Sequence, residues 1–399
     1  MAFHGIRAIF SSADEPKPSG SPSRKRFLAS PLLGTTGILT AIFAAMAILF
    51  VAAGFLTGSY RALRQSEAMR AFRTGQDLAR EGRAEEAIGL YRVALSLARD
   101  NPEYRLALAL ALQRVGQIEE AQTRLSELLQ ADPTNGVANF SLARIASQRG
   151  DIGSAETYYH RAIYGLWPTS AEANRLQARF ELVELLAATK EKQKLQAELL
   201  MLQDEVADDP NRQKRVAQLF LLADSPSNAA SLFRTVLSKD QQDAEAYAGL
   251  GEAEFQQSNL LAAQRAWRTA TRLNPENSAI QQRLDLVSAI VAMDPTLPGL
   301  RASERYARSR RLLALALARL DLCVNTQQGE ASPPVAQITA DAQRRLAQRS
   351  RASQYQEIAE ANSSLAIQVW QARQELCPQL SGGEEAVALL LNHLARAAQ

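Results

Sequence analysis

The fold can be predicted from residues 244–277, AEAYAGLGEAEFQQSNLLAAQRAWRTATRLNPEN, because their pattern of small and large residues recurs along the chain. A spacing of 34 residues separates Ala263 from Ala229, and Trp267 from Phe233. Further upstream the same spacing relates three sets of residues: Gly82, Gly116 and Gly150; Ala87, Ala121 and Ala155; Tyr91, Leu125 and Tyr159. A fixed period of this length indicates one supersecondary unit stacked many times.

The residue types explain how such units pack. Small residues such as Gly75, Ala109 and Gly251 allow two helices to approach closely, and large residues such as Tyr91 and Trp267 fill the space between units. Glycine also suits the tight turn between helices, where a positive φ costs it little. Each unit buries its apolar face only against its neighbours, so several must stack.

This pattern resembles the tetratricopeptide repeat, a helix–turn–helix unit. The resemblance implies an α-solenoid of about six units over residues 60–294. With one transmembrane helix before it and a C-terminal helical segment after it, both expected from the residues there, the fold is expected to be all-α. The fourth unit, about residues 170–209, is degenerate: it carries the charged run 190–194, has no glycine at its turn and is expected to have longer helices. Residues 278–293 are expected to form a closing helix.

The N-terminal part of the sequence predicts a membrane anchor. Residues 1–30 are basic and rich in Ser and Pro, which is typical of a disordered tail. Residues 31–57 form an apolar run long enough to cross a bilayer as a single transmembrane helix. Basic residues flank this run on both sides, which weakens the charge signal for orientation. We expect a cytoplasmic N-terminus, with the bulk of the chain periplasmic or otherwise extracytoplasmic.

The C-terminal region, residues 300–399, loses the period but stays helical, with helices expected over 302–323, 335–376 and 384–398. The polar stretch 348–354 leaves two alternatives open. If the long helix breaks there, Cys323 and Cys377 meet at one end of the bundle and a disulfide becomes possible. If the helix continues, its rise of about 1.5 Å per residue places the two cysteines about 50–60 Å apart.

Composition argues against several classes of function. A net charge of +3, from 45 basic and 42 acidic residues, gives no basic surface for nucleic acid. Three histidines and two cysteines do not form a metal-ligand pattern, and phosphate-binding or nucleophile motifs are absent from the sequence. We therefore expect no metal, no cofactor, no small-molecule substrate and no enzymatic activity.

The family resemblance implies a binding surface instead. In tetratricopeptide proteins the first helix of each unit lines a concave groove that binds protein or peptide partners. The matching positions here are Phe72, Gln76 and Arg80, then Leu106, Leu110 and Arg114, then Phe140, Arg144 and Gln148. Aromatic side chains with arginines beside them would suit a peptide that carries acidic groups.

The sequence thus predicts a membrane-anchored scaffold for protein–protein interaction, acting as a non-catalytic subunit of a bacterial cell-envelope or membrane complex. An alternative is a transient assembly factor or chaperone for envelope or cytochrome-type clients. A third, less favoured hypothesis is an enzyme with a site in the C-terminal region.

Overall fold

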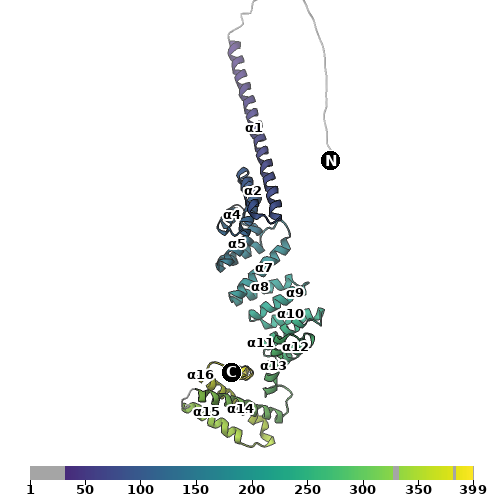
Figure 1. Cartoon of the computed structure of the whole chain (residues 1–399), viewed down its shortest axis with the longest axis vertical. Helices are drawn as coiled ribbons and strands as arrows, with labels where there is room; N and C mark the ends of the chain where they lie inside the picture. The colour runs from purple at the N-terminus through teal and green to yellow at the C-terminus, as the bar shows by residue number, and fades with distance from the viewer. Residues whose placement is uncertain (1–31, 327–331, 381–382, 399) are drawn as a thin grey trace, which may run out of the picture. The chain divides into compact units, whose positions relative to one another are not determined.

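The computed structural model describes residues 32–326, 332–380 and 383–398, with only the backbone of residues 32–37. Within these ranges the regular structure is helical, apart from one isolated parallel bridge between Asn135 and Leu166. The all-α fold expected from the repeats is confirmed (Figure 1). The predicted tail, residues 1–30, lies outside the described residues. The chain divides into two compact units, of which the first ends at Ala107 and the second begins at Leu108.

The first unit is dominated by α1 (Leu32–Arg80), a single helix of 49 residues. The sequence led us to expect a membrane helix over 31–57 and a separate repeat beginning near residue 60, but the two are continuous. The reason is local: the junction around Arg61, Ala62 and Leu63 contains good helix formers and no proline, so nothing ends the helix there. Within Ile38–Arg80, the most apolar segment has a mean hydropathy of 2.5, and 0% of it is buried inside the protein. By length and composition, this helix could cross a membrane.

The C-terminal part of α1 also serves as the first helix of the first repeat, and it packs on α2 (Ala84–Leu97). Gly75 permits this contact, because a Cβ atom at that position would lie 2.8 Å from Cε1 of Tyr91. Phe72 lies between Tyr91 and Tyr104, with ring centroids 5.7 and 4.5 Å away.

The repeats continue as pairs of antiparallel helices. Their bounds are α3 (Pro102–Arg114), α4 (Ile118–Ala131), α5 (Gly136–Gln148), α6 (Ile152–Ile163), α7 (Ala171–Ala188), α8 (Lys192–Glu205), α9 (Pro210–Leu222), α10 (Pro226–Lys239), α11 (Ala244–Gln256), α12 (Leu260–Leu273) and the closing helix α13 (Ser278–Met293).

The turn inside each repeat has one geometry, whatever residue occupies it. A residue with positive φ stands two positions before the second helix of each pair: Gly82, Gly116, Gly150, Lys190, Asp224 and Ser258. In each case the next amide donates to the carbonyl five residues upstream, as Gln117 does to Leu112 and Ser225 to Phe220. This hydrogen bond satisfies an otherwise unpaired carbonyl at the end of the first helix, so the turn persists without glycine.

The fourth unit departs from the others less than the sequence suggested. Its first helix, α7, has 18 residues, while its second, α8, has 14 residues, like α4, α10 and α12. Only one of its helices is therefore longer. Lys190, at a φ of 60°, occupies the turn position that glycine holds in the first three units.

Aromatic side chains of the second helices pack against glycines of neighbouring first helices. A Cβ atom on Gly249 would lie 2.1 Å from Cζ of Phe233, and one on Gly251 would lie 2.7 Å from Nε1 of Trp267. One continuous core, from Ala143 to Ala253, contains the fully buried Phe220 and Phe233. A second core joins the last repeat to the C-terminal helices and contains Trp267, Ile290 and Trp370.

The C-terminal region consists of α14 (Ala302–Thr326), α15 (Pro333–Ala347), a short 3-10 turn (Ala352–Gln354), α16 (Tyr355–Leu376) and α17 (Glu385–Ala397). The helix expected over 335–376 is therefore broken at the polar stretch, as in the first of the two alternatives. The rings of Tyr306 and Tyr355 stack at 4.5 Å, and Asn362 donates to Ser309 at 3.1 Å. These contacts hold α14 and α16 side by side.

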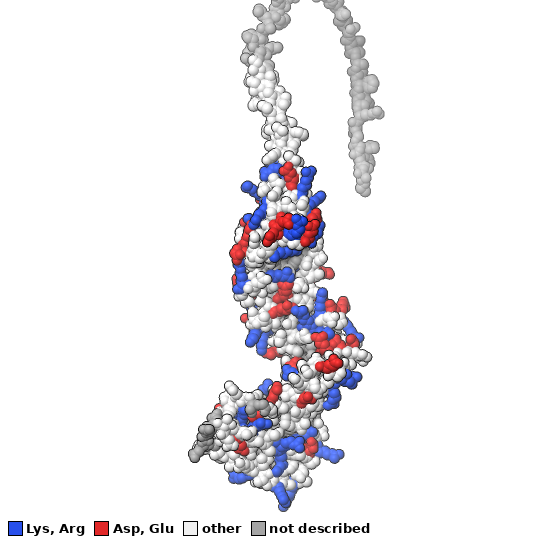
Figure 2. Space-filling model, viewed as in Figure 1, with Lys and Arg blue, Asp and Glu red and all other residues white. Residues whose placement is uncertain are grey.

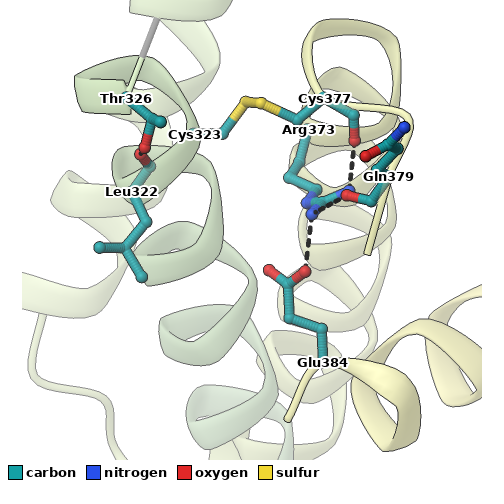
Figure 3. The surroundings of a disulfide bond; sticks show 7 residues. All are labelled: Leu322, Cys323, Thr326, Arg373, Cys377, Gln379 and Glu384. Atoms are coloured by element: carbon teal, nitrogen blue, oxygen red, sulfur yellow. Dashed lines mark hydrogen bonds and ion pairs between the residues drawn. A yellow bond between two sulfur atoms is a disulfide. The ribbon is translucent and has the colours of Figure 1, made fainter. Parts of the chain in front are cut away.

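A disulfide links Cys323 at the end of α14 to Cys377 after α16 (Figure 3). Beside it, the guanidinium of Arg373 donates to the carbonyls of Cys377 and Gln379 and to the carboxylate of Glu384, the last at 2.6 Å. The side chains of Arg373 and Glu384 are 3% and 2% exposed. The covalent bond and the buried ion pair thus fix the same end of the bundle.

Candidate functional site

The first helices of consecutive repeats are joined by ion pairs along one face of the second unit. We call this surface, with its half-buried apolar neighbours, the inner-helix face. Its charged members are Arg144, Glu181, Glu184, Arg215, Lys214, Glu245, Glu252 and Arg283. They connect α5 to α7, α7 to α9, α9 to α11, and α11 to α13. Each cation therefore has an anionic partner within the chain.

One part of this face is centred on Glu181. Arg144 donates to its two carboxylate oxygens at 2.8 and 2.5 Å, in the bidentate arrangement that guanidinium and carboxylate favour. The Tyr159 hydroxyl and the Gln177 amide donate to the same carboxylate at 3.1 and 2.9 Å. The guanidinium carbon of Arg144 also lies 4.0 Å from the ring centroid of Phe140.

These contacts shift three pKa values. Burial would raise the pKa of the Glu181 carboxyl, but hydrogen bonds from Arg144 and Gln177 outweigh it and lower that pKa below its usual range. The hydrogen bonds to Glu181 raise the pKa of Arg144. Burial, followed by the charge of Glu181, raises the pKa of the Tyr159 hydroxyl. Around neutral pH the site therefore holds one ion pair and a neutral phenol.

A second ionic contact is centred on Lys214 of α9. Its ammonium lies 2.9 Å from Asp243 and 2.8 Å from Glu245, and Gln218 also donates to Glu245 at 3.1 Å. Burial opposes the charged form of Lys214, but the hydrogen bonds from its amine to the two carboxylates raise its pKa overall. Asp243 also accepts from the Ala246 amide and so caps α11. The lysine thus holds the start of α11 against α9.

In the first unit, the three predicted groove residues differ in how exposed their side chains are. Phe72 is only 3% exposed and belongs to the aromatic core with Tyr91 and Tyr104, so the prediction that it lines a groove was wrong. Gln76 is half-buried. Arg80 is exposed and pairs with Asp77 at 2.8 Å. An aromatic side chain on a first helix can turn toward the second helix of its own repeat, which the sequence pattern did not distinguish.

The remaining predicted residues are closer to the surface. Leu106 and Leu110 are half-buried, and Arg114 is exposed at the end of α3. Phe140 is half-buried, with edge contacts to Tyr159 and Trp167, and Gln148 is exposed. Arg144 is exposed but engaged by Glu181. Its binding role for an acidic partner therefore requires competition with a carboxylate of the same chain.

Sequence reasoning missed Glu181 and Gln177 as parts of this surface, and it missed the buried Tyr159 as a donor to Glu181. Glu181 lies 37 residues after Arg144, and the analogous pairs lie 31 residues apart, close to the repeat period of 34. Opposite charges at nearly one period on successive first helices are thus the signal that could have found them.

The C-terminal region contains a separate pocket of about 530 Å³ between α16, α17 and the segment before α14. Arg305, Gln356, Glu360 and His393 line its polar part, and Ile367 and Leu394 its apolar part. Arg305 donates to Gln356 at 2.6 Å. Among the described residues there is no group of three or more His, Cys, Asp or Glu side chains that could hold a metal ion.

Comparisons with known proteins agree with the repeat geometry. Family models described as tetratricopeptide repeat match residues 78–132, 106–171 and 217–278. The chain is 33% identical over 116 residues to the TPR repeat-containing thioredoxin TTL4 of Arabidopsis thaliana, a match that covers 29% of this chain and 17% of that protein. It is 31% identical over 105 residues to the inactive TPR repeat-containing thioredoxin TTL3 of the same organism, covering 26% and 15%. The chain thus spans less than a fifth of either relative.

Solved structures of similar fold have low sequence identity. YrrB, described as a TPR protein with an unusual peptide-binding site, is 14% identical with a TM-score of 0.40, covering 48% of this chain and 96% of that one. The C-terminal part of a TPR repeat-containing protein from Cytophaga hutchinsonii is 12% identical with a TM-score of 0.41, covering 80% and 99%. The repeat matches and the helix pairs together show that this chain contains tetratricopeptide repeats stacked as an α-solenoid, an architecture suited to protein–protein interaction.

Proposed function

We propose that the chain is a membrane-anchored, non-catalytic scaffold that binds a protein or peptide partner through the inner-helix face. The observation that carries this proposal is the continuous row of exposed and half-exposed polar groups on successive first helices, with half-buried apolar side chains such as Phe140 and Phe255 beside them. A peptide lying along such a row would gain apolar contacts and hydrogen bonds in several repeats at once.

The charge of this face refines the kind of partner. Arg144, Lys214, Arg215 and Arg283 are matched by carboxylates of the chain itself, so the face offers little excess positive charge. We therefore favour a partner of mixed charge over the acidic peptide that the sequence suggested. Such a partner can exchange individual ion pairs without leaving a charge unmatched.

The anchoring half of the proposal rests on α1. Its described side chains from Ile38 to Leu56 are exposed and, apart from Thr40, apolar, with Phe50 82% and Phe55 75% exposed. An isolated helix with apolar side chains on all sides is unfavourable in water and is accommodated by a bilayer. We propose that residues 31–57 cross the membrane once.

We further propose that the repeats and the C-terminal region lie outside the cytoplasm, with the N-terminus inside. The disulfide between Cys323 and Cys377 supports this orientation, because such bonds persist in oxidising compartments and are rare in the cytosol. Among the described cysteines none is free. The disulfide, and with it the extracytoplasmic location, is tested by alkylating the cysteines in intact cells before and after reduction. Modification of either cysteine without a reductant contradicts the disulfide.

The role in a complex is tested by purifying the tagged full-length chain from its native membrane in mild detergent. A partner at fixed stoichiometry supports a structural subunit of an envelope or membrane complex. Substoichiometric and varied clients support the alternative of a transient assembly factor. A chain that alkaline carbonate removes from the membrane contradicts the anchoring.

The binding face is tested with Arg144→Glu combined with Arg215→Glu, two exposed arginines of the inner-helix face. A matched control reverses Arg268 and Arg272, which lie on the second helix α12, and so changes the charge equally elsewhere. We expect the first variant to lose the co-purified partner and the control to retain it, with thermal unfolding of both followed to verify folding. Equal retention in both variants contradicts partner binding at this face.

A further inference from the structure

The charged residues of the C-terminal region are unevenly distributed. Residues 301–311 and 341–360 contain nine arginines and four carboxylate side chains, a net charge of +5. The rest of the region, residues 312–340 and 361–399, contains three arginines and five carboxylate side chains, a net charge of −2. We call the first set of residues the arginine-rich end. Figure 2 shows basic side chains gathered at the lower edge of the C-terminal region.

Three helices meet at the arginine-rich end. Tyr306 of α14 stacks on Tyr355 of α16, with ring centroids 4.5 Å apart. Arg310 of α14 donates to the carbonyls of Leu346 and Gln348, at the end of α15, at 2.6 and 3.1 Å. The arginines of α14, of α15 and of the connection before α16 therefore lie at the same end of the bundle. Because α14 and α16 both begin here, their positive N-terminal dipoles add to this charge.

The carboxylates of the chain match few of these arginines. Arg308 pairs with Glu304 at 2.8 Å, and Arg344 pairs with Asp341. Among the residues that the structure describes, the other seven arginines of the arginine-rich end form no ion pair. This distinguishes the arginine-rich end from the inner-helix face, where the cations have carboxylate partners within the chain.

The unmatched arginines differ in how they are held. Arg305 donates to the carbonyl of Pro295 at 3.2 Å and to the side chain of Gln356 at 2.6 Å, and Arg310 is likewise held by carbonyls. These neutral acceptors position the two guanidinium groups without cancelling their charge. Four further arginines are exposed: Arg301, Arg311, Arg349 and Arg351. Positive charge thus lies both within this end of the bundle and on its surface.

We propose that the arginine-rich end binds an acidic segment of a protein partner, rich in aspartate and glutamate, as a second binding surface besides the inner-helix face. An excess of one sign of charge selects a partner of the opposite sign and speeds their encounter. Guanidinium groups also bind carboxylates in a bidentate arrangement. This inference does not depend on the membrane anchoring or on binding at the inner-helix face.

Single-stranded nucleic acid is the competing polyanion, because basic surfaces with aromatic side chains are typical of its binding sites. The aromatic geometry disfavours it here. Tyr306 and Tyr355 stack on one another and are both half-buried, so they do not provide separate open faces for successive bases. The half-buried Leu346 and Ile358 instead provide apolar surface for the side chains of a protein segment.

The test measures binding of a fluorescein-labelled peptide of alternating glutamate and alanine to the full-length chain in neutral detergent without reductant. The variant Arg301→Gln, Arg349→Gln, Arg351→Gln is compared with the control Arg265→Gln, Arg268→Gln, Arg272→Gln, which removes three exposed arginines from α12. We expect the first variant to bind the peptide about tenfold more weakly than the natural chain, because three exposed ion pairs of modest strength are lost. The control should bind the peptide as the natural chain does, and added salt should reduce the difference.

Thermal unfolding of both variants verifies that they fold. Equal affinity of the two variants for the peptide overturns the proposal, as does equal binding of a peptide with glutamine in place of glutamate by the natural chain. A single-stranded DNA oligonucleotide that binds more tightly than the acidic peptide, and no longer binds the first variant, overturns it in favour of nucleic acid. Each of these failures leaves the inner-helix face unaffected, since that face is tested with other arginines.

Discussion

The repeats from α4 to α13 and the C-terminal helices α14–α17 are both all-helical, but they are held together in different ways. In the repeats, two kinds of contact recur at about one period: a positive-φ turn, and an ion pair between successive first helices. In the C-terminal region, single contacts join residues more than 50 positions apart, such as Ser309 with Asn362 and Cys323 with Cys377. Repetition thus distributes stability among many similar contacts, whereas an irregular bundle depends on a few.

The largest effect expected from this contrast is in the buried ion pair of the C-terminal region. Arg373→Met removes the closest cation from the buried carboxylate of Glu384, which keeps only a longer contact to Arg319 at 3.9 Å, and also removes the donors to two carbonyls. We expect this to cost about 3–5 kcal/mol of unfolding free energy. Chemical denaturation measures the loss. The control is Arg311→Met on the exposed side of α14, and equal losses in both variants would contradict the special role of the pair.

The disulfide comes next. Replacing both cysteines by serine frees a loop of 54 residues, which corresponds to about 2–4 kcal/mol from the chain entropy of the unfolded state. Hydrogen exchange should show faster exchange in α14 and α16 and little change in α5–α10. Uniformly faster exchange in both regions would show that the repeats depend on the C-terminal bundle for their stability, and would contradict the view that their own recurring contacts stabilise them.

A glycine contact tests the repeats in the same way. Gly249→Ala places a Cβ atom 2.1 Å from Phe233, so the helices must separate, at an expected cost of about 1–3 kcal/mol. Gly153→Ala is the matched control, because no atom lies within 4 Å of its added Cβ. We expect this control to be neutral or slightly stabilising in thermal denaturation. A Gly249→Ala chain as stable as the natural one would mean that the packing of α10 against α11 does not require glycine at this position.

The smallest effect concerns the ion pair on the inner-helix face. Because the pKa of Glu181 is lowered in the folded chain, its contribution is fully present above the ordinary carboxyl pKa of about 4.3 and is lost as the pH falls through the lower folded value. Glu181→Gln should cost about 1 kcal/mol at pH 7, since Arg144 remains partly solvated. The difference from the natural chain should shrink below pH 4 in denaturation curves, and a constant difference would contradict the charge-based origin.

Much of the fold could be predicted from residue periodicity. The spacing of Gly82, Gly116 and Gly150, and that of Ala229 and Ala263, predicts the paired helices, because each unit repeats the same local contacts. The junction at Arg61 was not predicted, since an apolar span and a repeat helix share the same backbone geometry and composition alone does not end a helix. The absence of glycine at the turn around Lys190 was given too much weight. The hydrogen bond that caps the helix there is made by the backbone, so another residue can occupy the turn.

The candidate site was less accessible to sequence reasoning. The types and spacing of Arg144 and Phe140 indicate a first-helix surface, but the direction of each side chain depends on the neighbouring helices. Phe72 shows this: it has a residue type suited to a groove, yet Tyr91 and Tyr104 enclose it.

The helical class, the repeat period and the apolar segment follow from the residues alone, since these depend on interactions within about one repeat length. The break between α15 and α16 that brings Cys323 and Cys377 together, and the pairing of Glu181 with Arg144, are evident only in three dimensions. Both depend on the relative positions of separate helices, which are set by packing in three dimensions rather than by local residue pattern.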